Sequence, residues 1–156
     1  MTDANIRRID AGDRSWLREM LDMHWGGTTM VVHGEEIDVL CMQGLVAGER
    51  EGITIFRVGE RSELLLLHAL REGCGLGTLL LNAVIAEVRI NRGKYLLATT
   101  TNDNVNALRF YQKRGFRLLA LRPGAVNEAR RMKPRIPFVG KNGIPLRDEI
   151  DLMLTL

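Results

Sequence analysis

The feature that most limits how this chain can fold is a buried strand that runs through three alternate glycines into a helix. Four leucines at residues 64–67 predict the strand, and Gly73, Gly75 and Gly77 lie just before an apolar helical stretch. Glycines let a backbone approach a bound group closely, and the first amides of a helix point toward it with the positive end of the helix dipole. The turn therefore predicts either a phosphate or diphosphate site or a tight turn whose glycines serve packing alone.

Two common phosphate-binding motifs do not match this turn. A P-loop needs a lysine before its Ser or Thr, and here Thr78 follows Gly77 directly. The dinucleotide-binding fingerprint needs a glycine at position 78 and an early strand-helix-strand unit. Neither class of nucleotide-binding protein is expected from this motif.

The rest of the chain predicts a mixed α/β sheet in one domain, residues 1–156. Its length and its 46% hydrophobic and 26% charged residues are typical of one globular domain. Short β-rich runs separated by glycines from Thr29 to Leu67 predict an antiparallel meander, and helices are expected after Asp13, from Leu76 and after Asp103 or Asn104. Further strands are expected at 6–9, 95–98, 116–121 and 150–156, with a long polar connection between the last two.

Composition excludes several classes of protein. No apolar run is longer than four residues, so no membrane partner is expected, and the N-terminus lacks the apolar stretch of a signal peptide, which makes the cytoplasm the expected location. Cys41 and Cys74 are too few for a disulfide framework or a zinc site, so no metal is expected.

A basic cluster, Arg130–Arg135, leaves nucleic-acid binding as an alternative. The chain has a formal charge of +3 but only 5% aromatic residues, whereas nucleic-acid binders usually combine basic patches with stacking aromatics. The same charge suits a phosphorylated small molecule. We therefore expect no nucleic-acid partner.

A second segment, Thr99–Phe116, identifies a family. Its residues match the pattern Asn-x-x-Ala-x-x-x-Tyr-x-x-x-Gly-Phe at Asn104, Ala107, Tyr111, Gly115 and Phe116. Together with the glycine turn, this segment resembles the GNAT superfamily of acetyl-CoA-dependent N-acyltransferases. One departure is Glu72, where the family has Gln or Arg, and Arg71 is expected to supply the positive charge instead.

The resemblance implies a mostly antiparallel central sheet with a splayed parallel strand pair and flanking helices. It implies that acetyl-CoA lies with its pantetheine arm along the end of the strand and its diphosphate on the amides of the turn. The residues that match these roles are Leu67, His68, Ala69, Arg71, Gly73, Cys74, Gly75, Leu76, Gly77, Thr78, Asn104 and Ala107.

The resemblance also implies direct transfer of an acetyl group to the amine of a small molecule or peptide. Tyr111 matches the acid that protonates the departing thiolate, and Glu63 matches a carboxylate that serves as base, directly or through water. His68 lies five residues after Glu63, so strand alternation places the two on opposite faces. A non-catalytic acyl-CoA sensor is the alternative, and family members often form dimers.

The segment 133–149 resembles a tail found in a small bacterial subset of the superfamily. Its prolines predict a fixed, extended excursion. Asp148 and Glu149 open the last strand, where they either meet an amine substrate or are simply solvated.

Overall fold

Residues 4–156 are described in a computed structural model, and the chain divides into two compact units. The first takes in the chain up to Ser15, residues 41–97 and the last two residues, and the second takes in residues 16–40 and 98–154. Strand β7 (Tyr95–Thr101) begins in the first unit and ends in the second. The single domain expected from chain length stays a prediction.

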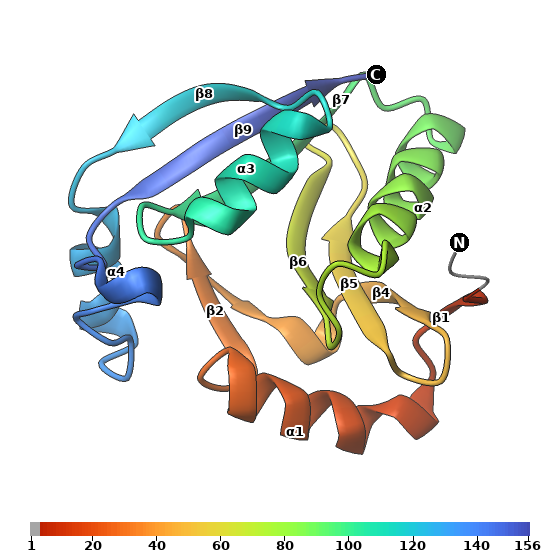
Figure 1. The fold of residues 1–156 in the computed structure, drawn as a ribbon, viewed down its shortest axis with the longest axis horizontal. Helices are drawn as coiled ribbons and strands as arrows, with labels where there is room; N and C mark the ends of the chain where they lie inside the picture. The colour runs from red at the N-terminus through yellow and green to blue at the C-terminus, as the bar shows by residue number, and fades with distance from the viewer. Residues whose placement is uncertain (1–3) are drawn as a thin grey trace. The chain divides into compact units, whose positions relative to one another are not determined.

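The first unit is an antiparallel meander followed by a helical crossover. Its strands lie in the order β1, β4, β5, β6, each antiparallel to the next, and helix α2 packs against β4, β5 and β6. Figure 1 shows β6 leading through a loop into α2. After α2 the chain returns as the start of β7, parallel to β6, where the Leu97 amide donates to the Ser62 carbonyl at 3.0 Å. The bounds are β1 (Ile6–Arg8), β4 (Gln43–Ala47), β5 (Gly52–Arg57), β6 (Glu63–Ala69) and α2 (Leu76–Ile90).

Close packing of α2 on the meander depends on a small residue at the start of β5. A Cβ at Gly52 would lie 3.1 Å from Leu80 Cδ1 and 3.2 Å from the His68 carbonyl oxygen. Leu80 and Leu81 of the helix are fully buried, as are Ile53 and Ile55 of the strand. This apolar contact fixes α2, and therefore its N-terminus, relative to the end of β6.

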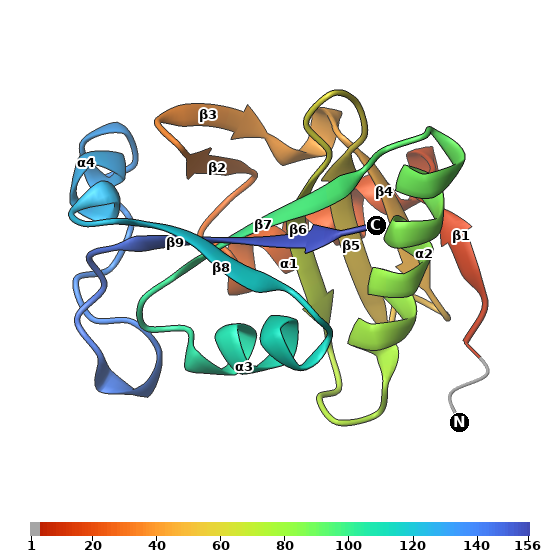
Figure 2. The ribbon, with the colours of Figure 1, turned by 90° about the horizontal axis from the view of Figure 1, so that it is seen from above.

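The second unit holds most of the remaining elements, whereas the 3-10 turn Ala11–Asp13 lies in the first. Strand β8 pairs antiparallel with β9, and β2 pairs with β3 as a separate hairpin. Helix α3 contacts β8, and α4 contacts β2; Figure 2 shows β8 running alongside β9. The bounds are α1 (Arg14–His24), β2 (Thr29–Val32), β3 (Glu35–Asp38), α3 (Val105–Lys113), β8 (Arg117–Arg122), α4 (Ala125–Met132) and β9 (Glu149–Thr155), with short 3-10 turns at Ala11–Asp13, Val39–Cys41 and Lys141–Gly143.

The expected fold class is confirmed. The chain is a mixed α/β protein with a mostly antiparallel sheet, one parallel strand pair and flanking helices. Within residues 4–156, no helix has both the length and the hydropathy required to span a membrane.

Helix α4 was not predicted from the sequence, which indicated only a polar connection there. It begins after Gly124, whose φ of +74° is left-handed, and only Val126 and Ala129 are buried. Its apolar residues 125, 126, 129 and 132 do follow a helical spacing, but eight residues are too short a window for that period to stand out among the polar neighbours.

The start of α1 also differs from the expectation that Asp13 caps it. Asp10 is the cap of the preceding 3-10 turn, since its side chain accepts a hydrogen bond from the Gly12 amide at 2.8 Å. Asp13 completes the capping box by accepting from the Asp10 amide at 3.0 Å. The prediction was wrong because the short turn places the cap three residues earlier.

Asp13 is buried between two arginines. Its carboxylate accepts hydrogen bonds from Arg7 at 2.6 and 2.8 Å and from Arg50 Nε at 3.1 Å, and the residue has 0% of its surface exposed. The Arg7 guanidinium holds the pKa of this carboxyl well below its ordinary value, although burial opposes the shift. The ionised side chain therefore ties β1 to the turn that starts α1.

We expect Asp13→Asn to lower the free energy of unfolding by about 2 kcal/mol at pH 7, because two arginines lose a buried anion. A depressed folded-state pKa stabilises the fold above the ordinary Asp pKa, about 3.9, and this contribution is lost as pH falls below it. Urea unfolding at pH 7 and at lower pH should show the difference between wild type and variant shrinking with acid. Asp22→Asn, at an exposed position of α1, is the control; equal stability of the two variants would contradict this role.

Candidate active site

Strand β6 contains a bulge that changes which side chains share a face. The register against β5 shifts at Leu65, which is an extra residue on β6. Glu63 pairs with Arg57 and His68 pairs with Ile53, so the two partners are four residues apart on β5 while Glu63 and His68 are five apart on β6. Directly paired residues lie on the same face of a sheet. The expectation of opposite faces for Glu63 and His68 is therefore wrong, because simple alternation fails across a bulge.

Glu63 is buried and held by an arginine. Its Oε2 atom accepts from Arg57 Nε at 3.1 Å and from Arg57 Nη2 at 2.6 Å, and the residue is 1% exposed. Beyond the bulge, the buried Thr54 hydroxyl donates to the Leu66 carbonyl at 2.9 Å. Both contacts link β5 to β6 and fix the strand that leads to the glycine turn.

The residues matched to the coenzyme arm lie at the half-buried end of β6. Leu67, His68 and Ala69 are all partly exposed, and the next amide, that of Leu70, donates to the Glu51 carbonyl at 2.9 Å. Strand pairing with β5 therefore continues to the last residue before the turn.

The turn after β6 leaves the N-terminus of α2 without a side-chain cap. Gly73 and Gly75 have φ of +77° and +84°, and Gly75 is the N-cap residue, with no side-chain hydrogen bond to the helix. The first amide that bonds within the helix is that of Leu79, to the Gly75 carbonyl at 3.0 Å. The amides of Leu76 and Gly77 come before it, so the helix itself supplies no acceptor for them. An anion is the natural ligand for such a helix end.

Two side chains of the turn have partners within the first unit. Arg71 Nη2 lies 2.7 Å from Glu51 Oε1, with 68% of the Arg71 side chain exposed. The Cys74 thiol donates to the Arg71 carbonyl at 2.9 Å, which closes the turn on itself. Glu72, the residue that departs from the family pattern, is exposed, and so are Gly73 and Gly75.

In the second unit, the predicted cap of α3 is confirmed and Tyr111 is buried. The Asn104 side chain accepts from the Ala107 amide at 3.2 Å. The Tyr111 ring packs at 5.4 Å from that of Phe110 and at 5.1 Å from that of Phe116. Burial raises the pKa of the Tyr111 phenol above its ordinary value, so the hydroxyl keeps its proton at neutral pH.

The segment 133–149 is tied to the turn before α3. The Asn102 side chain donates to the Pro145 carbonyl at 2.8 Å and accepts from the Arg147 and Asp148 amides, both at 3.0 Å. The buried Asp103 carboxylate accepts from the Lys141 amide at 2.8 Å. Hydrogen bonds thus hold the segment 133–149 in place, in addition to the rigidity predicted from its prolines.

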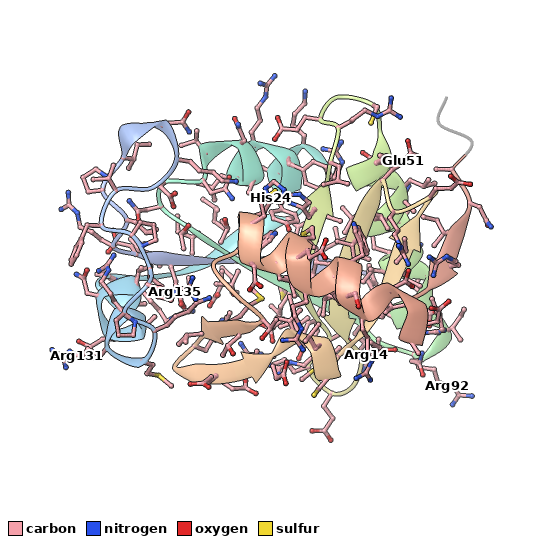
Figure 3. All side chains as sticks on the ribbon, turned by 90° about the horizontal axis from the view of Figure 1, so that it is seen from below. Arg14, His24, Glu51, Arg92, Arg131 and Arg135 are labelled. Carbon is pink, nitrogen blue, oxygen red and sulfur yellow. The ribbon has the colours of Figure 1, made fainter. Side chains whose placement is uncertain are left out.

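Two basic side chains of the cluster at residues 130–135, Arg130 and Lys133, also hold backbone segments in place. Arg130 donates to the Ile136 and Leu146 carbonyls at 3.0 and 2.9 Å, and Lys133 Nζ donates to the Thr29 carbonyl at 2.6 Å. Burial lowers the pKa of Lys133. Figure 3 shows Arg131 at the outer edge of the molecule, where it pairs with Glu128 at 3.1 Å. Two of the four basic side chains of the cluster are thus bound to backbone carbonyls.

Sequence reasoning missed one polar cluster of the second unit, around His33. It brings together residues of four separate segments: His33, Thr99, Arg122, Glu149 and Asp151. In the sequence, this cluster is indicated only by the acids that alternate at the start of β9. Glu149 is 4% exposed and bound by Arg122, so it is not a solvated charge.

Comparisons with known proteins agree with the motifs. Residues 56–116 match the model of the acetyltransferase (GNAT) family. The chain is 38% identical over 139 residues to the protein YdhI of Bacillus subtilis (strain 168), covering 86% of this chain and 87% of that one.

Two solved structures share the fold. A GNAT family acetyltransferase from Elizabethkingia anophelis with acetyl-CoA bound has a TM-score of 0.72 at 21% identity, and all of both chains is covered. A Bacillus subtilis acetyltransferase in complex with CoA has a TM-score of 0.70 at 17% identity, with 99% of each chain covered. With the glycine turn before α2 and the capped, tyrosine-bearing helix α3, these matches show that the chain belongs to the GNAT acetyltransferase family.

Proposed function

We propose that this protein transfers an acetyl group from acetyl-CoA to the amine of a small molecule or peptide. The observation that carries the proposal is the N-terminus of α2, a helix of 15 residues that begins at an exposed, left-handed glycine with no side-chain cap. Such a helix end stabilises a diphosphate through its amides and dipole. In this proposal the residues from Arg71 to Thr78 hold the diphosphate, and Leu67–Ala69 hold the pantetheine arm by main-chain bonds.

Arg71 contributes a charge in this proposal. Its ion pair with Glu51 is exposed, and exposed pairs contribute little to stability, so the guanidinium can exchange Glu51 for a phosphate at small loss of free energy. Glu72, beside Arg71, carries a negative charge that would repel a diphosphate, so in this proposal its exposed side chain points away from the bound group.

Tyr111 is the proposed acid. When the amine nitrogen attacks the thioester carbon, the C–S bond breaks and sulfur leaves with its electron pair, so a proton donor lowers the barrier. The Tyr111 phenol is protonated at neutral pH, as a donor must be, although burial raises its pKa and so makes it a weaker acid. Asn104 would contact the coenzyme arm through its amide nitrogen, since its oxygen caps α3 at the Ala107 amide.

Glu63 enters the proposal as a residue that acts through water. Its Oε2 is held by Arg57 and the residue is 1% exposed, so direct contact with a bulky acceptor is unfavourable. The ion pair also gives Glu63 a structural function across β5 and β6.

Coenzyme binding and turnover test the proposal in two steps. Calorimetry with coenzyme A should detect binding, and release of free thiol from acetyl-CoA should rise with at least one amine among spermidine, L-lysine, kanamycin and a short peptide with a free N-terminus. Binding without thiol release from any amine would favour a non-catalytic sensor of acyl-CoA. Absence of binding would contradict both.

We expect Gly75→Ala to weaken coenzyme A binding at least about tenfold, because a Cβ strains the left-handed N-cap by about 1–2 kcal/mol and shifts the amides that hold the diphosphate. Gly124→Ala is a matched control, since Gly124 is also a left-handed N-cap glycine without a side-chain cap, with no atom within 4 Å of an added Cβ. Calorimetry should show near wild-type affinity for that control. Equal loss in both variants would mean that general strain, and not the diphosphate site, is responsible.

We expect Tyr111→Phe to lower kcat by about 10² while coenzyme affinity stays within about twofold, because the ring still packs but no longer donates a proton. Tyr95→Phe removes a different phenol, which donates to the Glu60 carbonyl at 3.0 Å on the surface of the first unit, and is expected to keep full turnover. Thiol-release kinetics measure both variants. Equal kcat values for the two would exclude Tyr111 as the acid.

A further inference from the structure

An ion pair within the first unit links the β4–β5 hairpin to the turn proposed for the diphosphate. Arg71 Nη2 lies 2.7 Å from Glu51 Oε1, and both residues belong to that unit. Figure 3 shows Glu51 beside the loop that joins β6 to α2. Arg71 is the one arginine of the segment 71–78. The pair therefore places a carboxylate at the edge of the turn, on the guanidinium proposed to bind phosphate.

Glu51 is the fixed member of this pair. Its amide donates to the Ala47 carbonyl at 3.0 Å, and its carbonyl accepts from the Leu70 amide at 2.9 Å. Its carboxylate lies against Gly48, where an added Cβ would overlap Oε2. Backbone hydrogen bonds on both sides and this close contact hold the carboxylate near the turn.

The residue before Glu51 is anchored as well. Arg50 has φ of +66°, a left-handed conformation that glycine adopts more readily than arginine. Its side chain donates to the Gly12 carbonyl at 2.8 Å and to the Asp13 carboxylate at 3.1 Å. These bonds offset the unfavourable backbone conformation, so the hairpin loop presents Glu51 from a defined position.

Arg71 is the member of the pair that can change partner. Its side chain is 68% exposed, against 37% for that of Glu51. Its backbone is held because the Cys74 thiol donates to the Arg71 carbonyl at 2.9 Å. Rotation of the side chain alone can therefore carry the guanidinium from Glu51 toward the amides of the turn, where it could bind a phosphate through two parallel N–H groups.

A carboxylate and a diphosphate compete for this guanidinium. Arginine has five N–H donors, but two anions held on one guanidinium repel each other. Glu51 and Glu72 are negative and Arg71 is positive, so these three side chains carry one net negative charge. Release of Arg71 from Glu51 directs its positive charge to the phosphate. The affinity for a diphosphate is therefore reduced by the free energy needed to break the ion pair.

We propose that Glu51 is a positioning residue that holds Arg71 until the coenzyme binds, and that its competition with the diphosphate limits coenzyme affinity. This inference rests on the proposed function and adds a control of binding at the same site. The ion pair breaks when the coenzyme binds and forms again when it leaves. Its return favours release of coenzyme A after transfer, a step that every turnover requires.

The test measures coenzyme A binding by calorimetry in about 50 mM salt, where ion pairs are only weakly screened. We expect Glu51→Gln to tighten binding about three- to fivefold, which is the strength of a favourable exposed ion pair, and to slow coenzyme A dissociation by a similar factor. Dephospho-coenzyme A keeps the diphosphate and lacks the 3′-phosphate, so it should gain the same factor. Glu49→Gln, at an exposed position of the same loop, is the control and should leave affinity unchanged.

A double-variant cycle separates competition from simple repulsion. Arg71→Gln should weaken coenzyme A binding, and adding Glu51→Gln should then change affinity by less than about 1.5-fold, since no ion pair is left to break. Repulsion of the diphosphate by the Glu51 carboxylate would persist without Arg71. Thermal unfolding of these variants should stay close to that of wild type, because exposed ion pairs contribute little to stability.

Four results would overturn the inference while wild type still binds coenzyme A and the proposed function stands. These are weaker binding in Glu51→Gln, which would mean that the carboxylate supports the site, affinity equal to that of Glu49→Gln, a gain that persists with Arg71→Gln, and a gain absent with dephospho-coenzyme A. Failure of the wild-type protein to bind coenzyme A would overturn the proposed function and this inference together.

Discussion

The absence of a side chain over the first turn of α2 is the constraint on which the candidate site depends. Most helices satisfy their first amides with a Ser, Thr, Asp or Asn side chain. Here the N-cap is Gly75, an exposed residue in a left-handed conformation with no side chain to accept from these amides. The packing of Leu80 and Leu81 against β5 fixes the position of the helix, and the small Gly52 allows helix and strand to approach closely.

Strand β6 shows how one extra residue changes the arrangement of functional groups. The bulge at Leu65 brings Glu63 and His68 to one face, and the hydroxyl of Thr54 satisfies the Leu66 carbonyl beside it. The carboxylate of Glu63 is meanwhile bound to Arg57. The acid that matches the family pattern is therefore also a structural residue.

Local features were predictable from the sequence, and features that depend on tertiary contacts were not. The limits of α2, the Asn104 cap and the antiparallel meander follow from caps, periodicity and glycines within a few residues. The bulge could not be predicted because it depends on the register against β5. Helix α4 has only two buried residues, and the His33 cluster joins four segments that are far apart in the sequence.

The hydrogen bonds of Asn102 and Asp103 have a consequence for how sequences of this kind can diverge. These two residues precede α3 and form hydrogen bonds with the segment 140–148. The contact is close, because a Cβ on Gly140 would overlap the Asp103 carboxylate. An insertion or deletion in this segment must preserve these hydrogen bonds, because otherwise α3, which carries Tyr111, loses contacts that hold its first turn in place. Changes of length or charge in this segment are therefore expected away from the residues that bind Asn102 and Asp103, where they leave α3 undisturbed.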